Sequence, residues 1–230
     1  GGLDLSVGAV MTLTNCIASV LVNGSPAEIV FGMIATLLAG TAFGLANGLI
    51  VVYGRIQPII ATLATGAIAI GLALLVRPKP GGDVNSVWDF ADTYGLADGG
   101  DAWWLRPFAD IPMPLIIVLL VTVLVWVPFR RSVTGRTVYA IGSAEGAAFM
   151  SGLPIARAKI AAFTLAGFFA ACGGLYLAIQ TSSGNADLQQ AGAYTLNSIA
   201  AVVLGGTSLL GGVGGAVASL VGAAILRVIS

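Results

Sequence analysis

The sequence has few charges and lacks several residues on which chemistry in water depends. Lys, Arg, Asp and Glu make up 9% of its 230 residues, histidine is absent and there are two cysteines. A soluble domain carries about 25% charged residues, so this chain could not cover an aqueous surface of its own. Without histidine, the commonest metal ligand and general base is missing. The formal net charge is zero, and no nucleic-acid partner is expected.

Motifs for metal, phosphate and ion coupling are also missing. Cys16 and Cys172 lie in apolar runs without the spacing of a disulfide or metal pair, which indicates packing residues and no metal site. Lys79 and Lys159 are the only lysines. Neither follows a glycine, so the phosphate-binding loop of ATPases is absent. The apolar runs contain no buried acid–base pair, which proton- or sodium-coupled carriers often have.

The residues that are abundant are apolar. They make up 57% of the chain, the mean hydropathy is +0.98, and they form blocks of 17 to 24 residues. About 20 apolar residues cross a bilayer as a helix, and the backbone in lipid must satisfy its own hydrogen bonds. We therefore predict an all-α, polytopic transmembrane helical bundle. Its expected segments are residues 5–22, 29–52, 58–76, 113–129, 159–180, 193–210 and 213–229.

The charges in the loops predict an orientation. Residues 130–158 and the adjoining Lys159 hold five basic side chains and one acid, a net charge of +4, whereas residues 77–112 hold three basic and six acidic side chains, a net charge of −3. Basic loops face the cytoplasm, so residues 130–158 are expected inside and residues 77–112 outside. If every segment crosses the membrane in turn, Arg227 falls near the outer face, where a basic residue is not expected. Residues 193–210 could therefore either span the membrane or re-enter it.

The chain begins at Gly1 without a methionine and stops at Ser230 in an apolar run. We expect residues 1–230 to be a single transmembrane domain, truncated at both ends. An internal repeat is also visible. Residues 1–8, Gly-Gly-Leu-Asp-Leu-Ser-Val-Gly, match residues 205–212, Gly-Gly-Thr-Ser-Leu-Leu-Gly-Gly, at four positions. This repeat predicts duplicated, discontinuous glycine-rich helices, which mark the substrate path in many transporters.

Polar residues in or near the apolar runs have two interpretations. Asp4 could be the N-cap of the helix that follows it, or it could line a central cavity. The other polar groups could bond neighbouring helices together or line a translocation path. The candidates for the path are Asp4, Ser6, Asn15, Asn47, Thr62, Gln180, Asn197 and Ser208.

Small residues at four-residue spacing predict close helix packing. Gly40, Gly44 and Gly48 form one such series, and Gly211 and Gly215, followed by Ser219, form another. Glycines on one face of a helix let a second helix approach closely. This pattern indicates packing and does not identify a substrate.

The basic loop contains a predicted short helix over residues 143–152. Ser143 can cap it, Glu145 lies in its first turn where the helix dipole favours an acid, and Gly152 followed by Pro154 ends it. Its apolar residues, Ala148, Phe149 and Met150, would be exposed to the cytoplasm unless a partner covered them.

Several of these segments resemble one family. Residues 1–8 together with residues 199–208, Ile-Ala-Ala-Val-Val-Leu-Gly-Gly-Thr-Ser, resemble the ribose/xylose/arabinose-type permeases of bacterial ABC importers. Residues 134–136, Thr-Gly-Arg, with residues 139–142, Tyr-Ala-Ile-Gly, and the later Ser151 and Gly152 look like that family's cytoplasmic coupling segment. The resemblance runs nearly end to end and its motifs occur in the right order.

The resemblance implies a permease subunit of the bacterial inner membrane that is not itself an enzyme and holds no cofactor. It implies a monosaccharide as solute, a second copy of the permease, a periplasmic sugar-binding protein, a surrounding lipid bilayer and a separate cytoplasmic ATPase that binds the ATP. It also implies that the 143–152 helix docks on the ATPase. The residues expected to couple the two proteins are Arg136, Ser143, Glu145, Ala148, Phe149 and Gly152.

Three alternatives remain open from the sequence. The first is an ABC permease for another small solute, such as a branched-chain amino acid, an autoinducer or a nucleoside. The second is a secondary carrier driven by an ion gradient, and the third is a membrane scaffold that transports nothing. The 143–152 helix distinguishes them, because only an ABC permease needs it to bind an ATPase.

Overall fold

The computed structural model describes residues 2–82, 84, 120–209 and 211–229. Every named element in these ranges is a helix, and an isolated β-bridge joins Gly81 to Gly184. The elements in chain order are α1 (Val7–Leu21), α2 (Pro26–Tyr53), α3 (Pro58–Val76), the π-helix η2 (Thr122–Trp126), α6 (Val127–Arg131), α7 (Val133–Met150), α8 (Ile155–Thr181), α9 (Leu188–Leu204) and α10 (Ala216–Ile229). The predicted all-α helical bundle is confirmed.

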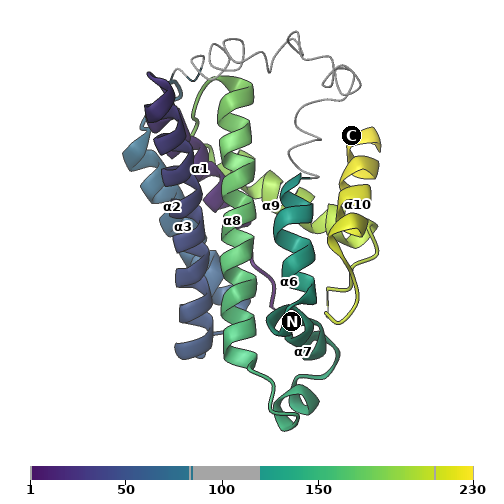
Figure 1. Ribbon diagram of the computed structural model, residues 1–230. Helices are drawn as coiled ribbons and strands as arrows, with labels where there is room; N and C mark the ends of the chain where they lie inside the picture. Colours follow the sequence, from purple (N-terminus) through teal and green to yellow (C-terminus); the bar gives the residue numbers. More distant parts are fainter. Residues whose placement is uncertain (1, 83, 85–119, 210, 230) are drawn as a thin grey trace.

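Three of the described helices are long and apolar enough to cross a membrane: α2 with 28 residues, α3 with 19 and α8 with 27. At 1.5 Å per residue they span about 42, 28 and 40 Å, against roughly 30 Å of bilayer hydrocarbon. They lie alongside one another in the bundle (Figure 1). The predicted segments 29–52, 58–76 and 159–180 fall within them, and α3 has the predicted bounds.

α1 is a short helix at the centre of the bundle. It packs against α2, α3, α8 and α9, and ten of its fifteen residues are buried. The chain reaches it through a non-helical segment, residues 2–6, which rises from near α7 in Figure 1. Its C-terminal end is held by Arg77, whose guanidinium donates to Ser19 Oγ at 3.1 Å and to the Ser19 carbonyl at 2.7 Å.

α9 differs from its predicted segment. Residues 193–210 were expected to be apolar helix, but α9 begins at Leu188 and ends at Leu204. It begins early because Asp187 caps it, accepting a hydrogen bond from the Gln189 N–H at 2.8 Å, and this polar start lies outside the apolar run. In Figure 1, α9 runs behind α8 and α6 across the direction of the long helices.

The segment before α10 also differs from its prediction. A helix was predicted over residues 213–229, but α10 begins at Ala216. Gly211, Gly212 and Gly214 have φ values of +94°, +80° and +140°, a left-handed region that ends helices and suits glycine. The two matching glycine segments therefore differ in where their helices begin. A helix starts at the seventh position of the first segment, whereas it starts four residues after the end of the second.

Of Gly211 and Gly215, which were predicted to pack helices together, Gly211 contacts a helix, since a Cβ on it would lie 2.7 Å from the Cα of Gly142 on α7. Both lie in the loop before α10, and a Cβ on Gly215 would meet nothing within 4 Å. Gly222 of α10 packs closely against the end of α9, because a Cβ on it would lie 2.5 Å from the Gly205 nitrogen. The left-handed turns at Gly211, Gly212 and Gly214 place this glycine series in the loop and delay the start of α10.

The first glycine series lies at the interface between α2 and α8. Gly40, Gly44 and Gly48 are buried, and a Cβ on Gly44 would lie 2.9 Å from the Cα of Gly167. A Cβ on Gly48 would lie 2.9 Å from the Cα of Ile160. These distances are shorter than packed carbon atoms tolerate, so the two helices approach this closely because the residues are glycine.

The basic segment, residues 130–158, is more helical than expected. Residues 130–158 were read as a polar loop with one helix over residues 143–152, but α7 runs from Val133 to Met150 with a non-helical residue, Ala144, at φ −161° and ψ 97°. Ser132 caps its start by accepting from the Gly135 N–H at 3.1 Å. The predicted cap was wrong, because Ser143 Oγ instead donates back to the Tyr139 carbonyl at 3.2 Å.

Two expected segments lie largely outside the described residues. Of the external loop over residues 77–112, the structure describes residues 77–82 and 84. Of the predicted helix over residues 113–129, it describes residues 120–129, which include the π-helix η2 and most of α6. No sequence feature predicted the π-helical geometry.

Candidate translocation path and coupling surface

The start of α1 is held by a polar cluster in the middle of the bundle. Asp4 Oδ1 accepts hydrogen bonds from the Ser6 N–H at 2.9 Å and from Ser6 Oγ at 2.6 Å. Ser6 is the N-cap position of α1. Asp4 is therefore not the N-cap residue that one interpretation made it. It stabilises the turn that leads into the helix.

Two other helices bond to the same turn. Asn47 of α2 donates from Nδ2 to Ser6 Oγ at 2.8 Å, and the Leu5 N–H donates to Thr62 Oγ1 of α3 at 3.0 Å. Asn47 and Thr62 are 0% exposed, and Ser6 is buried with them. The structure thus brings together four of the eight candidate path residues, Asp4, Ser6, Asn47 and Thr62. The Asn47 amide oxygen has no hydrogen-bond partner among the described residues.

A fifth polar residue, which sequence reasoning did not select, joins this cluster from α9. Thr195 Oγ1 accepts a hydrogen bond from the Gly8 N–H in the first turn of α1, at 3.1 Å. Gly8 allows this approach, because a Cβ there would meet Thr195 Oγ1 at 2.5 Å. The available signal was the same as for Thr62: a threonine within an apolar run.

The other four path candidates lie elsewhere. Asn15, two turns further along α1, donates to the Ser183 carbonyl at 3.2 Å and accepts from the Asn185 N–H at 2.9 Å. It therefore holds the α8–α9 link onto α1. The remaining three, Gln180 of α8, Asn197 of α9 and Ser208 of the 205–215 loop, are exposed.

The end of α7 forms an exposed apolar tip. Phe149 is 71% exposed and Met150 is 85% exposed. Gly152, at φ +73°, closes the helix by the turn that was predicted, in which the Leu153 N–H donates to the Ala148 carbonyl at 3.2 Å. The chain then reverses into α8.

Ala148 corrects the expectation that its side chain faces outward. It is 4% exposed and packs with Ile141 and Ala158 in a small core beneath the tip. On the outer side, Lys159 Nζ lies 2.5 Å from Glu145 Oε1. Both side chains are partly exposed, so this ion pair adds little to stability. Glu145, Ser143 and Arg136 remain on the surface.

α7 also contacts the glycine-rich loop over residues 205–215. Tyr139 donates its hydroxyl to the Gly214 carbonyl at 2.9 Å. The backbones of Gly142 and Gly211 touch, since a Cβ on Gly142 would lie 2.9 Å from the Cα of Gly211. This loop continues from α9, whose Thr195 bonds to the start of α1. A continuous set of contacts therefore links α7, which carries the exposed tip, to the central polar cluster.

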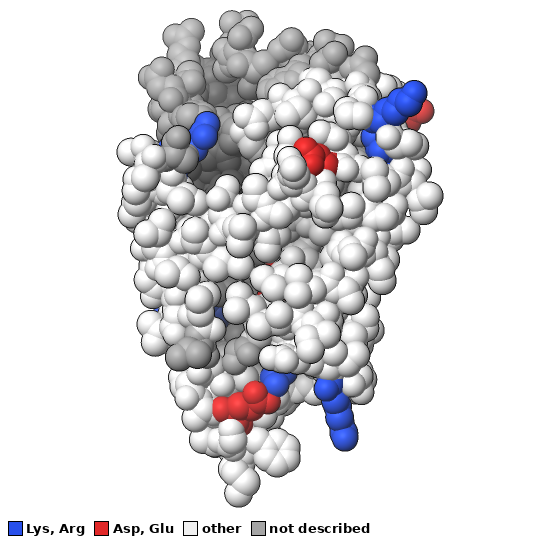
Figure 2. All heavy atoms as spheres, turned by 180° about the vertical axis from the view of Figure 1, so that it is seen from behind, with Lys and Arg blue, Asp and Glu red and all other residues white. Residues whose placement is uncertain are grey.

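The charged side chains gather at the ends of the molecule. In Figure 2, blue and red atoms lie mainly toward the top and bottom of this face, and an almost uncharged band separates them. Such a band fits the hydrocarbon layer of a bilayer. Among the described residues, no three His, Cys, Asp or Glu side chains form a group that could hold a metal ion.

The chain matches known transport permeases over its whole length. The family described as branched-chain amino acid transport system / permease component matches residues 1–230. The ribose import permease protein RbsC of Bacillus subtilis (strain 168) is 38% identical over 98% of this chain, which covers 66% of that protein. The D-allose transport system permease protein AlsC of Escherichia coli (strain K12) is 31% identical over 100% of this chain and 66% of its own length. The fructose import permease protein FruG of Bifidobacterium longum (strain NCC 2705) is 32% identical over 100% of this chain and 66% of its own length.

The chain therefore belongs to this family of ABC-importer permeases, as the sequence motifs predicted. It is a multi-pass protein of the inner membrane. It spans about two thirds of the length of the curated relatives it matches. No solved structure matches it.

Proposed function

We propose that this protein is the membrane-spanning permease subunit of an ATP-driven ABC importer that moves a monosaccharide across the inner membrane. The observation that carries the proposal is the end-to-end similarity to permeases named for ribose, allose and fructose. The subunit provides the path and is not itself an enzyme. A separate cytoplasmic ATPase binds and hydrolyses the ATP, so the permease needs no cofactor of its own.

The path in this proposal passes the start of α1. Ser6, Asn47 and Thr62 are hydroxyl and amide groups, which can donate to and accept from the hydroxyls of a sugar. In the described conformation Asn47 donates to Ser6, Thr62 accepts from the Leu5 N–H, and all three side chains are buried, which corresponds to a closed path. When α1 moves away from α2 and α3, these groups become free, and a sugar hydroxyl can take the place of each lost bond.

The exposed tip of α7 is the docking element for the ATPase. Phe149 and Met150 are large apolar side chains that are mostly exposed, and burial of such anchors dominates binding energy at interfaces. Arg136, Ser143, Glu145 and Gly152 surround or shape this surface. Ala148 supports it from beneath. A second permease copy and a periplasmic sugar-binding protein complete the proposed assembly.

A branched-chain amino acid is the second candidate solute, because the family's own description names this class. Uptake by right-side-out vesicles that contain the complete transporter and ATP inside distinguishes the two. We expect a labelled pentose or hexose to be taken up and to be displaced by unlabelled sugar but not by leucine. Displacement by leucine alone would replace the sugar proposal with the amino acid one.

Docking is tested by co-purification of the ATPase with the permease. Replacing Phe149 and Met150 together by Ala should lower the recovered ATPase by at least tenfold. A matched control, Val217→Ala, removes a similarly exposed apolar side chain from α10 and should leave the recovery unchanged. If both variants retain the ATPase equally, the tip of α7 is not its docking element.

A further inference from the structure

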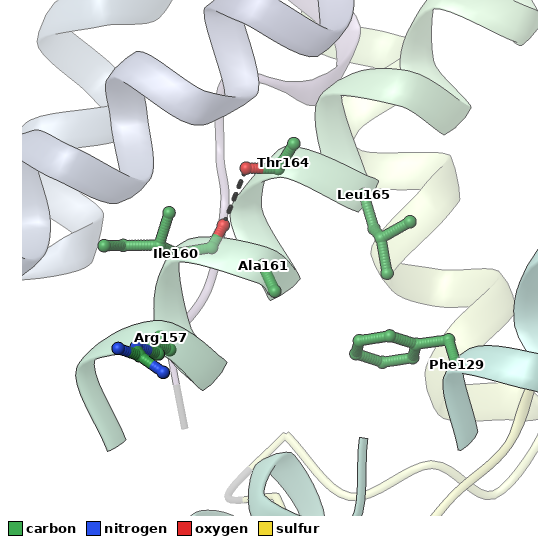
Figure 3. A pocket seen from close by; sticks show the side chains of 6 residues that line it. All are labelled: Phe129, Arg157, Ile160, Ala161, Thr164 and Leu165. Atoms are coloured by element: carbon green, nitrogen blue, oxygen red, sulfur yellow. Dashed lines mark hydrogen bonds between the residues drawn. The ribbon is translucent and has the colours of Figure 1, made fainter. Parts of the chain in front are cut away.

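A groove between α6 and α8 has properties that the transport function does not explain. Its volume is about 420 Å³, and it is lined by Phe129, Arg157, Ile160, Ala161, Thr164 and Leu165. Figure 3 shows Phe129 of α6 and Leu165 of α8 facing each other across it. Thr164 Oγ1 donates within its own helix, to the Ile160 carbonyl at 2.8 Å. The groove is therefore apolar except for Arg157.

The groove begins at the cytoplasmic boundary and extends into the membrane. Arg157 lies in the first turn of α8, and Phe129 lies in the short α6 that ends at Arg131. Leu165 is eight residues beyond Arg157 on the same helix, which places it about 12 Å deeper at 1.5 Å per residue. One end of the groove is thus cationic, and the remainder is an apolar slot long enough for much of one leaflet's acyl layer.

The charge at the cytoplasmic end has no counter-ion in the described part of the chain. Arg157 is exposed and makes no ion pair there, whereas the nearby Lys159 is paired with Glu145. Arg130 and Arg131 end α6 on the other side of the groove. The Arg130 guanidinium lies 6.0 Å from the Tyr139 ring centroid. The rim therefore carries an excess of positive charge at the depth where lipid headgroups lie.

We propose that this groove binds an anionic phospholipid of the inner leaflet. Its phosphate pairs with Arg157, and one acyl chain lies along Phe129, Ala161 and Leu165. Basic pockets between transmembrane helices on the cytoplasmic side favour anionic headgroups, and arginine recognises phosphate through two parallel hydrogen bonds. An uncharged apolar occupant would leave the arginine without a partner. A zwitterionic lipid would bring a positive group next to it.

The test is native mass spectrometry of the complete permease in detergent with added phosphatidylglycerol or phosphatidylcholine. We expect phosphatidylglycerol to remain bound at least fivefold more than phosphatidylcholine, since each basic residue near an anionic headgroup contributes about that factor. Arg157→Gln should remove this preference. Ala161→Phe, which fills the slot but keeps the charge, should also lower phosphatidylglycerol binding. Arg55→Gln, a change in the α2–α3 link, serves as the charge-matched control and should keep it.

Two results would overturn the proposal. The first is equal retention of both lipids, or a preference that survives both Arg157→Gln and Ala161→Phe. The second is disulfide formation between two permease copies carrying Ala161→Cys, which would make the groove a protein interface. Neither result depends on transport, so a failure here leaves the proposed sugar import untouched.

Discussion

At the scale of single residues, glycines decide how closely the membrane helices pack. Apolar side chains of a membrane helix gain little from leaving lipid for another helix, so association depends on close contact. Gly44 of α2 and Gly167 of α8 meet backbone to backbone, and both are buried. By contrast, Gly71 of α3 has no atom within 4 Å of an added Cβ. Glycine therefore permits a close helix contact at position 44, whereas at position 71 it serves no such contact in the described structure.

Gly44→Ala is expected to destabilise the protein by about 1–3 kcal/mol, the usual cost of forcing a methyl group into a packed site. Gly71→Ala should be neutral or stabilising, because alanine favours a helix over glycine by about 1 kcal/mol. Thermal unfolding in detergent, compared between the two variants, measures this difference. Equal melting temperatures would mean that α2 and α8 are not held by this contact.

Asn47 is the second residue whose environment permits a sharp prediction. Its amide nitrogen bonds to Ser6, but its amide oxygen is buried without a partner in the described structure. An unsatisfied buried acceptor costs about 1–3 kcal/mol, so this oxygen does not stabilise the described fold. A permeating hydroxyl could supply the missing donor.

Asn47→Leu should therefore lower sugar uptake by about tenfold or more while leaving the melting temperature unchanged or higher. Leucine keeps the number and branching of the side-chain heavy atoms, and it removes the unsatisfied oxygen together with the bond to Ser6. Asn197→Leu, at an exposed position on α9, is the control and should transport normally. Normal uptake by the Asn47 variant would exclude this residue from the path.

At this scale the sequence was enough to select polar candidates, but it could not predict which residues they contact. An amide or hydroxyl in an apolar run is conspicuous, so Ser6, Asn47 and Thr62 were recognised as candidates. Their partners could not be derived, because contacts between residues 41 or 57 positions apart depend on how helices are arranged. Thr195 was not selected, and its contact with Gly8 likewise depends on how distant helices are arranged. Ala148 is buried because α7 folds back onto the start of α8.

At the scale of elements, the contact between α7 and the 205–215 loop links the helix with the exposed tip to the buried start of α1. α7 carries the exposed tip, and the loop leads back along α9 to the first turn of α1. Gly142 lies at the contact itself, whereas Gly146, one turn later, has nothing within 4 Å of an added Cβ. These two glycines form a natural pair for testing the link.

Gly142→Ala should weaken the coupling between sugar delivery and ATP hydrolysis, because its new methyl group would displace the loop. We expect the stimulation of ATPase activity by the sugar-loaded binding protein to fall several-fold, with the ATPase still bound. Gly146→Ala should behave like the unaltered protein. If Gly142→Ala stimulates normally, movement of this loop does not carry the signal.

Element bounds were predictable where hydropathy alone sets them. α3 begins at a proline and ends where its apolar run ends, so its prediction was correct at both ends. Helices that extend past their apolar run were cut short: α8 begins at Ile155 and α9 at Leu188 because caps and turns, not hydropathy, start them. The left-handed glycines before α10 had the opposite effect, since they delay a helix that composition would have started earlier.

At the scale of the whole molecule, the distribution of charge sets the orientation. The segment that holds η2, α6, α7 and the start of α8 carries four of the eight arginines and a single acid, and such a basic segment is predicted to stay in the cytoplasm. Glu28, in the first turn of α2, accepts hydrogen bonds from the N–H and the hydroxyl of Ser25 in the turn between α1 and α2. That turn is expected on the external side.

Membrane-impermeant maleimide labelling tests this orientation. Phe149→Cys should be labelled in inside-out vesicles and protected in intact spheroplasts, and Asn23→Cys should show the reverse. The native thiols give little background, because Cys16 is buried and Cys172 is half-buried. Labelling of both positions from the same side would contradict the assigned topology.

The family, the closed polar cluster and the exposed α7 tip all lead to one central claim, that this permease moves a sugar at the expense of ATP hydrolysed by a partner. The most direct measurement is sugar uptake into proteoliposomes that hold the complete permease and its ATPase, with the binding protein outside and ATP inside. We predict that sugar uptake requires ATP and the binding protein, and that it continues after an ionophore collapses the ion gradients. Uptake that persists without the ATPase and stops with the ionophore would contradict it and would identify an ion-coupled carrier instead.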